Sequence, residues 1–204
     1  MGFFVTFGIV IIFVLWLNYE IRKNNRLAKK SSEEFWEKEA NANMSRKTDI
    51  SNLDYIRIPY EKLPLNDTPD DTINFYRDTI LSQSDKKILN LSGFSNTELK
   101  LKYGAANLSK LSEYDNNFTV LVATLHKWGE RLYQQGYHNE ALAVLEAAVD
   151  CKSDVRKTYE LLAQIYMAHG SPDKIDNLID AINRINIAGK ENLVLKLNNI
   201  KNKI

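Results

Sequence analysis

A pattern of large and small apolar residues recurs between residues 122 and 184, and it constrains the fold more than any other feature. The first copy consists of Leu125, Trp128, Gly129, Leu132, Ala141 and Leu145. The same positions 34 residues later hold Tyr159, Leu162, Ala163, Tyr166, Ile175 and Ile179. Residues at i, i+3 and i+7 share one helix face, and a small residue beside the middle one lets a second helix approach. The pattern therefore predicts two successive helix hairpins.

Glycines mark the end of the first helix in each hairpin. Gly136 recurs as Gly170, directly after the expected helix end. Glycine adopts the left-handed conformation of a helix C-cap without steric cost. Both positions are therefore predicted turns between paired helices.

The interval and the residue types resemble tetratricopeptide repeats, here over residues 122–155 and 156–189. This resemblance implies an all-α fold in which antiparallel helix hairpins form a small α-solenoid that binds proteins or peptides. The chain departs from the family pattern at Ile175 and Ile182, where the family prefers alanine, and at Ser153 and Ile187, where it prefers proline.

The same resemblance implies a binding groove on the first helix of each repeat. Its inward-facing positions are His126, Glu130, Tyr133, Gln134, Glu160, Gln164 and Met167. The lysines and asparagines with which chaperone-binding relatives hold a terminal carboxylate are absent from these positions. The resemblance therefore implies a mixed polar and apolar peptide.

Further helices should complete a helical domain over residues 67–204, because roughly three repeats are needed to bury a continuous core. Thr68 to Asp71 predicts a helix start, and that helix should reach about Gln83. Ser95 and Glu98 form a capping box that opens a helix to about Tyr114. Residues 190–203 are predicted to be a capping helix with one apolar side.

The amino-terminal residues 2–19 carry no charge and are followed by a basic stretch. Such a run spans roughly 27 Å at 1.5 Å per residue, close to a hydrocarbon core of about 30 Å. Residues 1–20 are therefore predicted to be a transmembrane helix in contact with lipid. Basic residues after the span place the carboxyl-terminal domain in the cytoplasm, in a single-pass protein of a bacterial plasma membrane.

Residues 21–66 are predicted to connect this span to the domain. Ser31 with Glu34 indicates a capping box for a short helix to about Asn43. Beyond it, the strip from Tyr55 to Leu65 mixes apolar residues with prolines and should be extended. The strip either packs along its own domain, which the entropy of ordering such residues favours, or docks a partner.

No pattern for chemistry is present in the sequence. The three histidines lack metal-ligand spacing, and no phosphate loop, paired-cysteine motif or nucleophile elbow occurs. We therefore expect no enzyme activity, catalytic residue, cofactor, metal or small-molecule substrate. A net charge of +1 does not support nucleic-acid binding. The lone Cys151 suits a reducing compartment and a buried role.

Three functions fit these features. The first is a membrane-anchored adaptor that recruits a protein or peptide through the groove. The second is an extracytoplasmic chaperone similar to the translocon-associated repeat proteins of bacteria, against which the basic flank argues. The third is a structural subunit of a membrane complex.

Overall fold

A computed structural model describes residues 2–202, except for the side chains of residues 3–6, 10 and 11. Every regular element in this part of the chain is a helix, which confirms the predicted all-α class. The chain divides into two compact units, and each is described by itself. The first comprises residues 1–48 and 95–108, and the second comprises residues 49–94 and 109–204.

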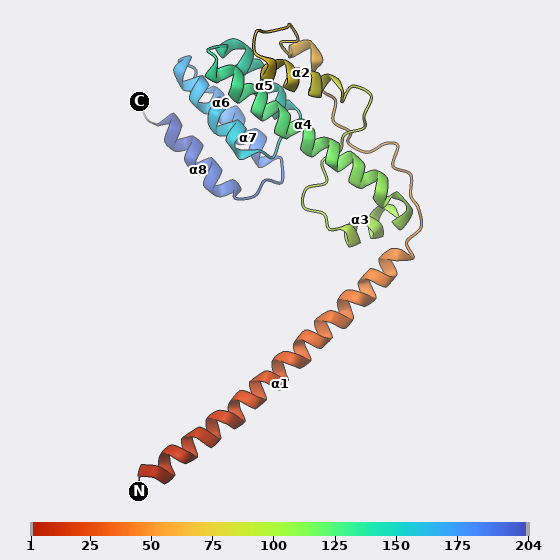
Figure 1. Cartoon of the computed structure of the whole chain (residues 1–204), viewed down its shortest axis with the longest axis vertical. Helices are drawn as coiled ribbons and strands as arrows, with labels where there is room; N and C mark the ends of the chain where they lie inside the picture. Colours follow the sequence, from red (N-terminus) through yellow and green to blue (C-terminus); the bar gives the residue numbers. More distant parts are fainter. Residues whose placement is uncertain (1, 203–204) are drawn as a thin grey trace. The chain divides into compact units, whose positions relative to one another are not determined.

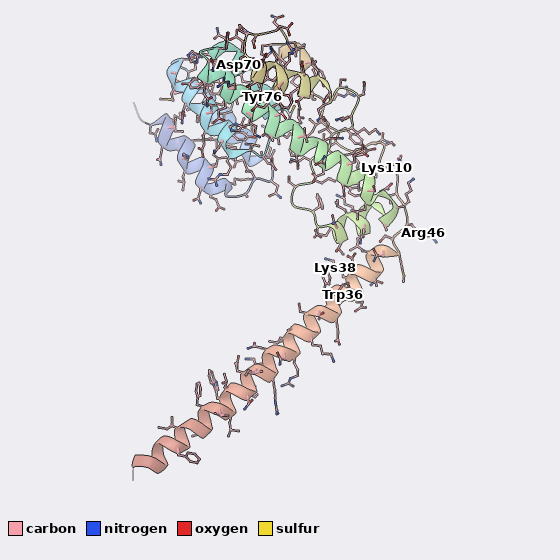
Figure 2. All side chains as sticks on the ribbon, in the orientation of Figure 1. Trp36, Lys38, Arg46, Asp70, Tyr76 and Lys110 are labelled. Carbon is pink, nitrogen blue, oxygen red and sulfur yellow. The ribbon has the colours of Figure 1, made fainter. Side chains whose placement is uncertain are left out.

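The first unit is built from α1 (Gly2–Asn43), α3 (Asn96–Tyr103) and the 3-10 turn η2 (Ala105–Asn107). The end of α1 packs on α3. Lys100 forms an ion pair with Glu39, and the Thr97 hydroxyl donates to the same carboxylate at 2.7 Å. Ala42 is fully buried there, whereas Trp36 projects from α1 and remains 64% exposed (Figure 2). Among the side chains of α1 that the structure describes, those in its last turns therefore belong to a packed core.

The predicted helix start at Ser31 is wrong, because α1 continues without a break to Asn43. Lys29 and Lys30 lie 3.8 Å from Glu33 and Glu34, respectively, one turn further along. Pairs at this spacing stabilise a continuing helix. Since the residues before Ser31 are already helical, its capping pattern has no free helix end to satisfy.

The predicted transmembrane helix is also wrong. Within the described residues, no helix has the length and apolar character needed to cross a bilayer. The side chains of residues 3–6, 10 and 11, which belong to the predicted span, lie outside the described ones. The single-pass membrane localisation, with its cytoplasmic carboxyl-terminal domain, is overturned with the span.

The predicted helix from Ser95 to Tyr114 is interrupted at Gly104. The capping box of Ser95 and Glu98 is present and opens α3. Gly104 then adopts a φ of +89°, and a Cβ atom there would collide with the backbone of Arg46. Because only glycine fits this close approach, α3 ends and a new helix begins after η2.

The second unit contains η1 (Tyr60–Lys62), α2 (Asp71–Leu81), α4 (Leu108–Gln134), α5 (His138–Asp150), α6 (Arg156–Ala168), α7 (Lys174–Asn183) and α8 (Lys190–Lys201). The last five helices follow one another as two hairpins and a final helix (Figure 1). The helix α5 packs on α6, and α8 packs on both α6 and α7. This arrangement is consistent with an α-solenoid. The predicted limits of the domain and its repeats stay a prediction.

The two hairpins end their first helix with the same hydrogen bonds. The Tyr137 amide donates to Leu132 O at 3.0 Å, and the Ser171 amide donates to Tyr166 O at 2.9 Å. Each bond bridges a glycine with positive φ, Gly136 or Gly170. These are Schellman caps, in which the left-handed residue lets the chain turn back and satisfies a free helix carbonyl.

The core of the first hairpin depends on one close approach between α4 and α5. Trp128 is fully buried, and its neighbour Gly129 faces Leu145, which is also fully buried. A Cβ atom at Gly129 would lie 2.6 Å from the Leu145 side chain. In the second hairpin the same position is Ala163, which is also fully buried. The small residue beside the large one therefore sets the helix separation.

The strip from Tyr55 to Leu65 packs on its own unit. Leu63 is buried, and Ile56, Ile58 and Tyr60 are half-buried against the helical core. The Ile56 amide donates to Ile88 O at 2.9 Å. Of the two interpretations of this strip, the structure therefore supports packing along its own domain.

The start of α2 is held by Asp70 rather than by Thr68. The Asp70 carboxylate accepts from the Thr72 and Ile73 amides, and its second oxygen lies 2.6 Å from Arg131 of α4. Figure 2 labels this residue at the beginning of α2. One carboxylate therefore both caps α2 and ties it to the first hairpin.

Replacing Trp128 with alanine tests this core. We expect Trp128→Ala to lower the free energy of unfolding by about 3–5 kcal/mol, because a large buried side chain leaves a cavity. The matched control is Trp36→Ala, an exposed residue whose loss should change stability by no more than about 0.5 kcal/mol. Urea unfolding of the full chain, followed by far-ultraviolet circular dichroism, measures both. Equal midpoints for the two variants would mean that the hairpin core is assigned to the wrong helix face.

Candidate functional site

The residues of the predicted groove differ widely in exposure. Gln134 and Gln164 are exposed, His126 is buried, and the others are half-buried, namely Glu130, Tyr133, Glu160 and Met167. They lie on α4 and α6, the first helices of the two hairpins. The accessible part of this surface therefore centres on the two glutamines.

His126 is not available to a ligand in this structure. It is 9% exposed, and its Nδ1 atom has no hydrogen-bond partner among the described residues. Burial lowers the pKa of His126, while the Glu130 carboxylate acts in the opposite direction. The side chain is therefore a neutral, largely packed residue of α4.

Two other groove residues already have partners within the chain. The Tyr133 ring lies 4.9 Å from the His138 ring, centroid to centroid. The Glu160 carboxylate lies 2.6 Å from Lys196 of α8. A ligand on this surface would have to bind beside these contacts or replace them.

A second concave site, which the sequence did not indicate, lies elsewhere in the second unit. It is a cavity of about 620 Å³, within the usual range for ligand pockets. Its apolar walls include Ile56 of the strip, Leu89, Val149 of α5 and Ile185 after α7. These residues come from four segments that are distant in sequence, so no local pattern could have identified the site.

The segment 89–93 forms one side of this cavity and is held at several points. The Leu89 amide donates to Tyr114 O at 3.2 Å, and the Leu91 amide donates to Asp115 Oδ1 at 2.9 Å. The Ser92 hydroxyl donates to Asp154 at 3.0 Å, and Asn186 Nδ2 donates to Ser92 O at 3.3 Å. These hydrogen bonds hold the cavity wall in place.

Charged side chains in the cavity wall are mostly paired. Lys152 forms an ion pair with Asp54, and Asp150 lies 2.6 Å from Lys62. Arg184, at the end of α7, also lines the cavity. Within the described part of the chain, its guanidinium makes no ion pair or side-chain hydrogen bond.

Metal-ligand sets are absent from the described residues, in which no group of three or more His, Cys, Asp or Glu side chains could hold an ion. The single cysteine is fully buried beside the cavity wall, with Sγ 4.0 Å from Arg57 O. Burial raises the pKa of the Cys151 thiol to about 12, and the neighbouring Asp150 carboxylate acts in the same direction. This thiol is therefore a packed core group and not a nucleophile.

The raised pKa makes a chemical prediction for Cys151. At pH 8 the native chain should react with a thiol-disulfide reagent at least about 100-fold more slowly than the chain unfolded in guanidinium, because thiolate is scarce and access is blocked. Absorbance of the released thiol measures both rates. A native rate close to the unfolded one would show that Cys151 is accessible and ionised. Raising the pH to 9 should leave the native reaction slow, since the folded pKa lies well above that value.

The comparisons with known proteins identify no relative. No protein-family model matches the chain, and no curated protein or solved structure matches it.

Proposed function

We propose that this chain is a protein-interaction scaffold that binds an extended peptide segment across α4 and α6. The observation that carries the proposal is the repeated geometry of the two hairpins. Their first helices end in the same Schellman cap, and a small residue, Gly129 or Ala163, lies at the same point of each core. Stacked helix hairpins present equivalent faces side by side, as the tetratricopeptide repeats that this sequence resembles do.

The exposed groups on this face suit a peptide backbone. Gln134 and Gln164 each carry an amide that can both donate and accept hydrogen bonds. Met167 and Tyr133 are half-buried beside them and add apolar surface. Polar groups that fix a backbone, next to apolar patches that hold side chains, favour a mixed peptide over a strongly charged one.

Charge also argues for a peptide. The predicted groove contains two carboxylates, Glu130 and Glu160, and one of them is already paired with Lys196. A polyanion such as a nucleic acid would meet these two carboxylates on the face. An adaptor of this kind needs no catalytic group, since its function is to hold its partner.

Substitution of Gln164 tests the proposal. Peptides are first selected from a displayed random library on the full chain, and the affinity of an enriched, labelled peptide is then measured by fluorescence polarisation. Gln164→Arg should weaken binding at least about 10-fold, or about 1.4 kcal/mol, because it places a long cation in the middle of the face. The matched control is Asn177→Arg on α7, also exposed, which should leave the affinity within about 2-fold.

Both substitutions are at exposed positions, so both variants should melt like the parent chain. Failure to enrich any peptide would contradict the scaffold. Equal losses in the two variants would also contradict it, because the effect would then come from added charge and not from the α4 and α6 face.

A further inference from the structure

We infer that the cavity beside Arg184 is a second peptide site, which takes an acidic side chain flanked by an apolar one. The first reason is the charge balance of its wall. Lys152 is paired with Asp54, and Asp150 is paired with Lys62, so these charges offset each other, while the Asp154 carboxylate accepts a hydrogen bond from Ser92 at the wall. The Arg184 guanidinium is left to bind an anion.

The ligand carries one negative charge at this point. A guanidinium binds a carboxylate through two parallel hydrogen bonds, and the pair is neutral. A dianionic phosphate would meet a single unpaired cation and would lie near the carboxylates of Asp54 and Asp150, which line the same cavity. The wall therefore matches a glutamate or aspartate side chain better than a phosphate.

The remaining surface favours a peptide over a free small acid. Ile56, Leu89 and Ile185 provide apolar wall next to the charged group. A volume of about 620 Å³ accommodates an apolar side chain together with the acidic one. A small carboxylate would leave this apolar surface uncovered, whereas a short acidic and apolar segment would bury it.

The cavity is also arranged in advance. Asn186 and Asp154, from segments on either side of α6 and α7, both bond to Ser92 and hold the wall in place. A Cβ atom at Gly93, whose φ is +93°, would collide with Asn186, so the wall packs closely there. A ligand therefore meets an ordered surface and loses little free energy in ordering it.

This second site extends the proposed scaffold function, because both sites take a peptide, but it lies on different residues and can be tested separately. The probe is a fluorescein-labelled peptide, Gly-Ser-Leu-Glu-Leu-Ser, and its counterpart has glutamine in place of glutamate. On the unmodified full chain, we expect the glutamate peptide to bind at least about 10-fold more tightly than the glutamine peptide. This comparison needs no variant, so it cannot be confounded by misfolding. Equal affinities, or no binding of the glutamate peptide, would overturn the inference.

Two single variants test whether the peptide binds at Arg184. Arg184→Gln should remove the preference for glutamate. Arg57→Gln, the same charge change on an exposed strip residue outside this cavity wall, should retain it. Equal effects of the two variants would mean that net charge, not the cavity, causes the preference, and would overturn the site. If Arg184→Gln alters only the thermal melt and keeps the preference, Arg184 merely stabilises the end of α7.

Two further experiments test whether the ligand is a peptide or a small carboxylate, and whether the peptide binds at the cavity or on the α4 and α6 face. Acetate at the peptide's concentration should not compete, and competition by acetate would overturn the peptide ligand. Gln164→Arg should leave this peptide's binding unchanged. Loss of binding in Gln164→Arg, with Arg184→Gln unaffected, would move the peptide to the α4 and α6 face and overturn the cavity site, while the proposed scaffold function would stand.

Discussion

The second unit depends on the close contact between α4 and α5 at Gly129 and Leu145. Because Gly129 has no side chain, Leu145 of α5 can pack directly against α4, and the neighbouring Trp128 is fully buried. The indole Nε1 is buried and has no hydrogen-bond partner among the described residues. The second hairpin then packs against the first through α5 and α6.

Contacts from other parts of the chain limit the proposed peptide-binding face as much as the two hairpins shape it. His126 occupies a groove position by its register, yet packing against neighbouring helices buries it. Lys196 of α8, which lies 36 residues further along the chain, forms an ion pair with the Glu160 carboxylate. The capping helix therefore both completes the core and narrows the available face. The two exposed glutamines are what remains for a ligand after these contacts are made.

The cavity beside Arg184 arises from segments that are not helical. The strip around Ile56 and the segment 89–93 run beside each other and join the ends of α5, α6 and α7. The charged residues of the cavity are drawn from across the unit, and within the described part of the chain the Arg184 guanidinium has no ion-pair partner. The helical repeats and the extended segments therefore create two different kinds of surface in one unit.

Local patterns in the sequence determined the all-α class, the buried face of each first helix and the glycine caps. Trp128, Gly129 and Gly136 could be assigned because helix periodicity and left-handed caps depend on residues within a few positions of each other. Tertiary structure alone decided which groove positions stay open, where the cavity forms and which charges are paired. Burial of His126 and pairing of Glu160 with Lys196 require distant segments to meet, and no local pattern encodes that meeting. At Ser31 a local pattern gave a wrong prediction, because its capping pattern lies inside a helix that has already begun.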